Sequence, residues 1–257
     1  MEILRSDSNG VCTLTLNRPN VFNSFNQTMA FQLHAALDAC AVDDNVRVVV
    51  IKGEGKAFCA GQDLAEVIDP EGPEMKNIVG EHYNPIILKI RNLEKPVIAA
   101  VNGVAAGAGA NIALSCDITI AKKSAAFIQA FSKIGLIPDS GGTFFLPRLI
   151  GLQKAMALMF TGEKVGAEQA EKLNMIYKAV DDETFEEEVL KFAETLAVMP
   201  TRGLGLTKKA VNLGLFNNLE DQLAVEGVLQ TEAGETEDFR EGVNAFLEKR
   251  AAVFKGK

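Results

Sequence analysis

The feature that most constrains the fold is a series of short β-branched runs separated by stretches of helical spacing. The runs are VCTLTL (11–16), RVVVIK (47–52), VIAAV (97–101), DITIA (117–121) and MIYKAV (175–180). Segments of this length and composition are typical of buried strands. Because helices between strands have to cover the faces of the sheet, the alternation predicts a layered α/β core.

Apolar residues recur at helical spacing between the first runs, which predicts helices over residues 29–40 and 83–90. Residues 69–85 are charged and contain proline and glycine, so we expect a mobile cover there rather than packed structure. After about Met199 no strand pattern remains, and three helices are expected, over 201–214, 218–234 and 235–254. These patterns divide the chain into a core, 1–198, and a helical unit, 199–257.

The end of the helical unit carries an apolar stripe that a short tail cannot bury alone, together with cations in an otherwise acidic chain. The stripe is Val243, Phe246, Leu247 and Val253, and the cations are Lys249, Arg250 and Lys255. We expect subunit contacts there. The alternative is a tail packed on its own subunit, with its basic residues matching the helix dipole.

Composition excludes several classes of protein. With 26 basic and 34 acidic residues the net charge is −8, which argues against a nucleic-acid partner. The four cysteines lie far apart in the sequence and there are two histidines, so neither a disulfide framework nor a metal site is indicated. No apolar stretch reaches the roughly 18–20 residues of a membrane span, and no signal pattern begins the chain. We expect a soluble, cytoplasmic protein.

Two glycine-rich segments lie at predicted strand ends: KAFCAGQDL (56–64) and VNGVAAGAGANIAL (101–114). Glycines at such junctions let a ligand approach the backbone, and a helix N-terminus offers unpaired N–H groups that can bind an anion. Two alternatives are open. Gly103, Gly107 and Gly109 loosely match a dinucleotide fingerprint with the wrong spacing, and close helix–sheet packing also needs glycine.

Asp139 is the only acidic residue of IGLIPDSGGTFFLPRLIG (134–151). Taken locally, Pro-Asp-Ser-Gly-Gly is turn chemistry, in which the aspartate bonds its own backbone two residues on. Whether Asp139 has a catalytic role has to be decided from the rest of the chain.

Five collinear segments carry a resemblance. LNRPNVFNSF, KAFCAGQDL, KPVIAAVNGVAAGAGANIALSCDI, GLIPDSGGTFFLPRLIG and EGVNAFLEKRAAVF resemble the crotonase (enoyl-CoA hydratase/isomerase) superfamily. The resemblance implies a spiral of ββα repeats, a C-terminal helical trimerisation region and an acyl-CoA thioester substrate. It also implies an oxyanion hole made by the backbone N–H groups of Gln62 and Ala108. One such donor typically contributes about 3 kcal/mol to transition-state stabilisation.

Departures from the superfamily pattern narrow the chemistry. Hydratases hold a water between two glutamates, and the matching positions here carry Asn111 and Phe131, so hydration is not expected. Asp139 occupies the place where the superfamily's double-bond isomerases carry their base. Desolvation raises a carboxyl pKa, so we expect a raised pKa for Asp139 from an apolar setting of Phe131, Ile137, Phe144 and Leu146.

A narrower similarity is to the ring-epoxide isomerases of bacterial phenylacetate catabolism, carried by FCAGQDL, VNGVAAGAGANIAL, AFSKIGLIPDSGGT and YNP (83–85). It implies conversion of ring-1,2-epoxyphenylacetyl-CoA to an oxepin-CoA, with 3-enoyl to 2-enoyl-CoA isomerisation, by Asp139 as acid and base. No cofactor or metal is implied. The implied substrate contacts are Val21, Phe22, Ala60, Asp63, Leu64, Tyr83, Asn111, Phe131 and Phe144. For the aromatic members ordinary core packing is the alternative, and Asn111 is equally suited to a helix cap or to filling space.

The resemblance also implies a homotrimer or a dimer of trimers, with other enzymes of the pathway as further partners. In that assembly Phe254 and Lys255 would contact the CoA adenine and phosphate in a neighbouring subunit. Two other functions stay open: a fatty 3-enoyl-CoA isomerase, and a scaffold that binds acyl-CoA without turnover.

Overall fold

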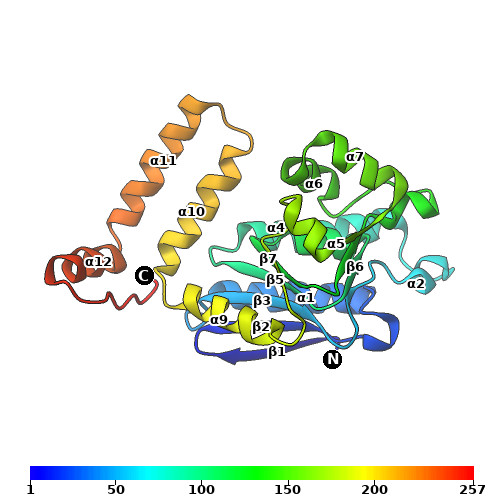
Figure 1. The fold of residues 1–257 in the computed structure, drawn as a ribbon, viewed down its shortest axis with the longest axis horizontal. Helices are drawn as coiled ribbons and strands as arrows, with labels where there is room; N and C mark the ends of the chain where they lie inside the picture. The colour runs from blue at the N-terminus through cyan, green and yellow to red at the C-terminus, as the bar shows by residue number, and fades with distance from the viewer.

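The computed structural model describes residues 1–257, whose strands form two sheets (Figure 1). The larger sheet has the order β1-β2-β3-β5-β7-β10. Its strands are β1 (Ile3–Ser8), β2 (Val11–Leu16), β3 (Val48–Gly53), β5 (Val97–Val101), β7 (Ile118–Lys122) and β10 (Lys178–Val180). Only β1 pairs antiparallel, with β2, and the other pairings are parallel. The parallel part therefore needs crossover connections, which the helices supply.

The smaller sheet has the order β4-β6-β8-β9. It consists of β4 (Ala57–Cys59), β6 (Val104–Ala106), β8 (Ala126–Ile128) and β9 (Lys164–Gly166). Consecutive strands alternate between the sheets: β3, β5 and β7 enter the larger sheet, and β4, β6 and β8 follow them into the smaller one. A helix then closes each unit, as α5 (Ala108–Ser115) does after β6. This is the expected α/β spiral of ββα repeats.

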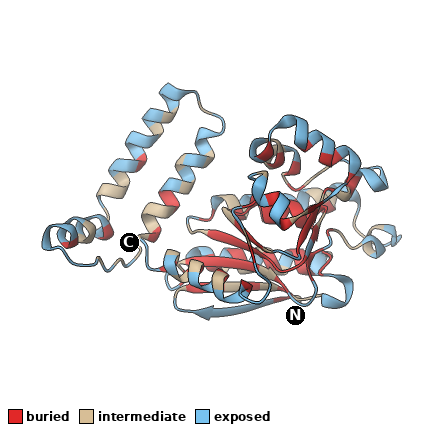
Figure 2. Cartoon of the chain, viewed as in Figure 1, coloured by how far each residue is buried: buried red, intermediate tan, exposed pale blue.

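Buried residues lie mainly in the strands and on the helices that cover them (Figure 2), and the apolar ones among them form one large cluster. On one face of the larger sheet, α1 (Gln27–Val42) and α4 (Asn84–Asn92) bury Leu33 and Ile90, and every residue of α5 is buried. On the other face, α9 (Phe185–Ala197) buries Phe185 and Val189 against the strands. The remaining short elements are η1 (Pro19–Val21), α2 (Leu64–Ile68), α3 (Met75–Asn77), η2 (Ile78–Tyr83), η3 (Ala130–Ile134), α6 (Gly142–Ile150), α7 (Leu152–Thr161) and α8 (Ala167–Lys172).

The predicted strands and the first two helices are confirmed, except that β10 keeps only the last three residues of 175–180. The expected cover is wrong for residues 78–83. They form a turn of π-helix that leads into α4, and Ile78, His82 and Tyr83 are buried in it. The buried side chains of this segment continue the helical spacing of α4, and this signal is masked in the sequence by the charged residues around them. The strands we did not predict are β1, which is polar and mostly exposed, and the three-residue strands of the smaller sheet.

Three helices after residue 200 form an arm that projects from the core (Figure 1). They are α10 (Thr201–Gly214), α11 (Leu219–Gly234) and α12 (Glu237–Glu248). The third ends earlier than expected, because Lys249 has a left-handed φ of 55°, so Val253 lies outside the helix. The tail then folds back, and the buried Asp238 carboxylate accepts hydrogen bonds from the N–H groups of Lys255 (2.6 Å) and Gly256 (2.7 Å). None of the helices combines the length and apolar character needed to cross a lipid bilayer.

Candidate active site

The first glycine-rich turn is held by a strand-like contact with Phe25. The Phe25 N–H donates to the Gly61 carbonyl (2.7 Å), and the Asp63 N–H donates to the Phe25 carbonyl (2.8 Å). Residues 61 and 63 thus bond toward Phe25, and the Gln62 N–H between them points the other way. Gly61 has a φ of 95°, which a residue with a side chain rarely adopts.

The second turn lies against the first. Gly107, with a φ of 54°, precedes Ala108, the first residue of α5. A Cβ atom placed on Gly61 would lie 3.0 Å from the Ala106 carbonyl oxygen and 3.5 Å from the Ala108 nitrogen. Neither the Gln62 N–H nor the Ala108 N–H donates a hydrogen bond within the protein. Two backbone N–H groups without an acceptor in the protein, one of them at a helix N-terminus, therefore lie on adjacent turns.

The side chain of Gln62 is fixed at both ends. Its Oε1 accepts a hydrogen bond from the Tyr83 hydroxyl (2.9 Å), and its Nε2 donates to Glu66 Oε2 (2.8 Å). The Tyr83 ring is buried and packs beside Phe25, with 5.8 Å between ring centroids. Burial raises the pKa of Tyr83 well above its ordinary value, so the hydroxyl keeps its proton as a donor. Tyr83, predicted as a substrate contact, thus supports the turn that carries the Gln62 N–H.

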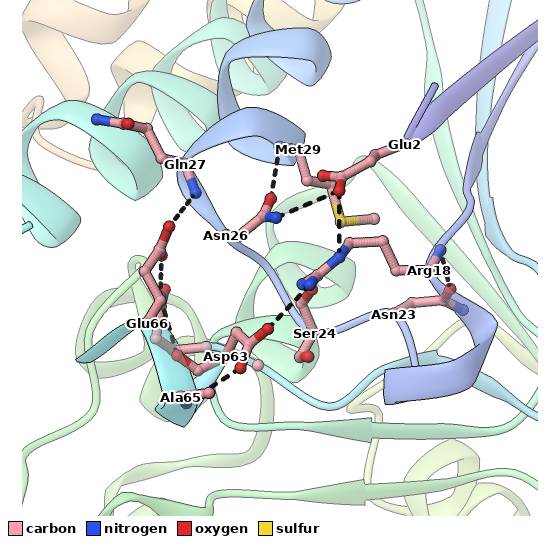
Figure 3. Close-up of polar contacts among 12 residues, drawn as sticks. Glu2, Arg18, Asn23, Ser24, Asn26, Gln27, Met29, Asp63, Ala65 and Glu66 are labelled. Carbon is pink, nitrogen blue, oxygen red and sulfur yellow. Dashed lines mark hydrogen bonds and ion pairs between the residues drawn. The ribbon is translucent and has the colours of Figure 1, made fainter. Parts of the chain in front are cut away.

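Charged residues hold the outer side of the same turn (Figure 3). Asp63 pairs with the Arg18 guanidinium (2.9 Å) and caps α2 by accepting the Ala65 N–H (3.1 Å). Glu66 accepts the Gln27 N–H at the start of α1 (2.8 Å). Both carboxylate oxygens of Asp63 are therefore occupied by protein donors, which favours a structural role over the predicted substrate contact.

Asp139 lies in a tight turn before α6. Ser140 and Gly141 have left-handed φ values of 50° and 76°, and the Gly142 N–H donates to the Asp139 carbonyl (2.8 Å). The predicted turn is therefore present, but its hydrogen bond is made by the backbone carbonyl of Asp139 and not by the side chain. The carboxylate instead accepts the Ser140 hydroxyl (2.8 Å), and burial raises the pKa of Asp139 above its ordinary value. The direction of this shift confirms the expectation, although Ile137, expected beside the carboxylate, is 80% exposed and points to solvent.

Asn111 supports this turn from α5. Its side chain is fully buried, its Nδ2 donates to the Asp139 carbonyl (2.8 Å), and its Oδ1 accepts Gln129 Nε2 (2.8 Å). This burial favours an internal role over contact with substrate. Several supporting residues of the site were not predicted, among them Glu66, Gln129 and Ser140. The available signal for Gln129 was one amide in the apolar run AAFIQAF.

The remaining predicted contacts lie in three different surroundings. Phe131 is buried near the second turn, since a Cβ atom on Gly107 would lie 3.8 Å from its ring. Phe144 instead stacks on Phe216 of the arm, with 5.5 Å between centroids and the Arg148 guanidinium 3.7 Å from its ring centre. The exposed members are Val21, Phe22, Ala60 and Leu64. Sequence reasoning did not indicate that Phe144 faces the arm.

Phe254 and Lys255, the residues expected at a neighbour's site, pack on their own arm in the single chain. The Phe254 ring lies over Gly242, 3.5 Å from where a Cβ atom would be, and Lys255 Nζ is 3.6 Å from the Glu237 carboxylate. An apolar cavity of about 460 Å³ beside Phe254 is lined also by Phe239, Val243, Phe246 and Leu247.

The sequence matches the family model for enoyl-CoA hydratase/isomerase over residues 6–257. The chain belongs to the enoyl-CoA hydratase/isomerase family. Within it, the chain is 50% identical to the 1,2-epoxyphenylacetyl-CoA isomerase of Escherichia coli (strain K12), over 99% of this chain and 98% of that protein. It is 38% identical to the trans-2-decenoyl-[acyl-carrier-protein] isomerase of Streptococcus mutans serotype c, over 100% of this chain and 98% of that protein.

The fold agrees with solved members of the enoyl-CoA hydratase/isomerase family. A crystal structure of enoyl-CoA hydratase from Bacillus anthracis superposes with a TM-score of 0.93 at 32% identity, covering 100% of both chains. The expected crotonase-like fold and the expectation of an enzyme of this family are therefore confirmed. The dinucleotide-binding alternative for the glycine segments is wrong.

Proposed function

We propose that the protein isomerises acyl-CoA thioesters by moving a proton with Asp139. The observation that carries the proposal is that α5, which begins at the free N–H of Ala108 beside the Gln62 turn, also contacts the turn of the half-buried Asp139 through Asn111. A carboxylate with a raised pKa is a stronger base, and N–H donors stabilise the negative charge that collects on a thioester oxygen when the α-carbon loses its proton.

In the enoyl reaction Asp139 takes the proton from the α-carbon of a 3-enoyl thioester. The electron pair moves onto the thioester oxygen at the two N–H groups, and Asp139 returns the proton to the γ-carbon, which leaves the 2-enoyl isomer. In the ring epoxide the bond between the two epoxide carbons breaks as the ring expands to the oxepin. Asp139 carries the proton from the α-carbon to the ring γ-carbon, which leaves an exocyclic double bond conjugated with the thioester. Atoms balance in both reactions without a cofactor.

We propose ring-1,2-epoxyphenylacetyl-CoA as the principal substrate, because of the 50% identity to an isomerase named for it. A straight-chain enoyl thioester is the second candidate, supported by the 38% identity to an isomerase of a decenoyl chain. Hydration is disfavoured, since Asn111 and Phe131 replace the carboxylates that would activate water.

Purified protein given the epoxide, a 3-enoyl-CoA and crotonyl-CoA in parallel tests these choices. Isomerisation leaves product mass unchanged and alters the absorption spectrum, whereas hydration adds the mass of one water. We expect isomerisation of the epoxide to be fastest and hydration of crotonyl-CoA to be at least about a thousandfold slower. Comparable hydration and isomerisation rates would reject the assignment of the carboxylates, and binding without any turnover would indicate a scaffold.

For assembly we propose a homotrimer or a dimer of trimers in which the arm packs on a neighbour. Support comes from the apolar side chains that α12 leaves exposed, including Phe246 (83%) and Leu247 (72%). In such an assembly Phe254 and Lys255 would lie close to the CoA of the neighbouring subunit. Light scattering at micromolar concentration tests this, because a mass near 27.6 kDa would mean a monomer.

A further inference from the structure

Asn111 joins the two halves of the site through one rigid helix. Ala108, whose N–H is free, begins α5, and Asn111 lies three residues later on the same helix. The Asn111 side chain reaches the backbone of Asp139 rather than its carboxylate. The first turn of α5 therefore carries an oxyanion donor at one point and the support of the base at another.

The contact between Asn111 and the turn of Asp139 is closely fitted. A Cβ atom on Gly142 would lie 2.3 Å from Asn111 Nδ2, so α6 can begin against this amide only because residue 142 is glycine. The Asp139 carbonyl already accepts the Gly142 N–H, and Asn111 supplies its second donor. The carbonyl is therefore held from two elements, α5 and α6.

Gln129 fixes the orientation of the Asn111 amide. Its Nε2 donates to Asn111 Oδ1, which leaves Asn111 Nδ2 directed at Asp139. The Gln129 side chain is buried, and its Oε1 has no hydrogen-bond partner. Gln129 thus bonds Asn111 through Nε2 while its own oxygen stays unpaired. A buried polar atom without a partner is unfavourable, so the bond to Asn111 that accompanies it indicates a geometric requirement at this place.

We propose that Asn111, oriented by Gln129, is a positioning residue that sets the place of the Asp139 carboxylate relative to the oxyanion donors. This inference rests on the proposed function of Asp139. Asn111, at the position matched to a hydratase glutamate, thus holds the proposed base by a hydrogen bond to the backbone carbonyl of Asp139. A displacement of the order of 1 Å between base and substrate can reduce a rate about 100-fold, so the effect should appear in kcat.

The decisive variant is Asn111→Leu, which keeps the size of the side chain and removes the donor. With 3-enoyl-CoA as substrate, we expect kcat to fall about 30- to 100-fold while KM changes less than about threefold. The acid limb of the kcat profile should move to lower pH, because a released Asp139 turn gains solvent and loses part of the desolvation that raises its pKa. Gln129→Met should shift both quantities in the same direction by a smaller amount.

Asn102→Leu is the matched control. Asn102 is also a buried asparagine that ties backbone segments together, through the Gly53 N–H and the Gly55 carbonyl, but it does not contact the turn of Asp139. It should lower the melting temperature as much as Asn111→Leu does, and leave kcat and the acid limb unchanged. If Asn111→Leu behaves like this control, or loses activity through KM alone, the inference is wrong.

Two further results complete the test. Where Asn111→Leu fails to fold, Gln129→Met decides, and an unchanged kcat and acid limb in that variant would overturn the inference. Asp139→Asn, measured in parallel, separates this inference from the proposed function. An active Asp139→Asn protein would reject the base itself, whereas an inactive one beside a fully active Asn111→Leu protein would reject only the positioning role.

Discussion

The core and the arm differ in how they use their apolar residues. In the core, apolar side chains from both sheets and the covering helices form continuous buried clusters, and the site is assembled inside them. After residue 198, only Leu206, Leu229 and Ala245 among the apolar residues are buried, while side chains such as Phe216 and Leu219 are about three-quarters exposed. A face of this kind is stable when something covers it. The core therefore holds the proposed site, and the arm presents the apolar surface on which the proposed trimer depends.

The largest effect that separates the two regions is expected from Asp139→Asn. The amide keeps the size and the Ser140 contact but cannot accept a proton, so isomerisation should fall by about two to four decades. Acyl-CoA affinity, oligomer mass and melting temperature should stay close to those of the parent protein, because a half-buried carboxylate without a cationic partner contributes little stability. Steady-state kinetics measures the isomerisation rate, and light scattering measures the oligomer mass. Activity within about threefold of the parent would remove Asp139 from the mechanism.

The parent protein should also show the raised pKa of Asp139 in its pH profile. The base acts when ionised, so kcat should decline on the acid side at a pH above the ordinary aspartate value of 3.8.

The sequence predicted the core well, and the reason is physical. Runs such as VVVI and VIAAV are buried on both faces, so the same apolar, β-branched residues indicate both a strand and its burial. The glycine turns and Asp139 could also be found, since each breaks the pattern around it. The supporting roles of side chains in the site could not be predicted: Tyr83 and Asn111 were expected as substrate contacts, and Gln129 was not expected at all. Tyr83 and Gln129 act through hydrogen bonds to residues 21 and 18 positions away in the sequence, and no local pattern specifies such pairs.

In the arm the helices were predictable and their surroundings were not. Helical spacing in α12 indicates which residues are apolar, but not whether they meet a neighbour or the tail of the same chain. The end of α12 at Glu248 depends on one left-handed residue, Lys249, whose type does not predict that conformation.

The next largest effect should come from the arm. Deleting residues from Ala251 onward removes Phe254 and Lys255 and should weaken acyl-CoA binding about tenfold if they contact CoA in a neighbour. Part of the loss should disappear at high salt, because phosphate attraction is screened. The core should keep most of its melting temperature, since the tail bonds mainly to Glu241 and Asp238 of α12 and makes one long hydrogen bond to the core, from Arg47 to the Phe254 carbonyl (3.4 Å). Equal losses of affinity and stability would instead indicate a tail that only holds its own subunit together.

A smaller effect is expected within the core from Tyr83→Phe. The change removes the hydroxyl that holds Gln62 Oε1 and keeps the buried ring. A loosened Gln62 turn should lower kcat about three- to tenfold with little change in KM, because the oxyanion donor matters most in the transition state. Tyr177→Phe is the control, since Tyr177 is the other tyrosine, is 58% exposed and packs on Phe192. A larger effect in the control would contradict the assignment.

The smallest effect should be a loss of stability in mild acid, and it should begin in the core because both histidines lie there. Burial lowers the pKa of His82 and of His34 below the ordinary value of 6.5, and His82 has no hydrogen-bond partner for either ring nitrogen. Above that value both rings are neutral in the folded and the unfolded chain. Below pH 6.5 the histidines of the unfolded chain bind protons, whereas those of the folded chain stay neutral until a lower pH. The free energy of unfolding therefore falls as the pH drops.

Melting temperatures at pH 7.5 and 5.5 test this, in a range above the titration of ordinary carboxylates. A shift of about 2–4 °C corresponds to 1 kcal/mol in a chain of this size. The double variant His34→Gln and His82→Leu keeps a donor for the His82 carbonyl and removes both titrating rings, so its melting temperature should change less between the two pH values. If parent and variant lose the same amount, groups other than these two histidines are responsible for the acid sensitivity, and the core has no special part in it.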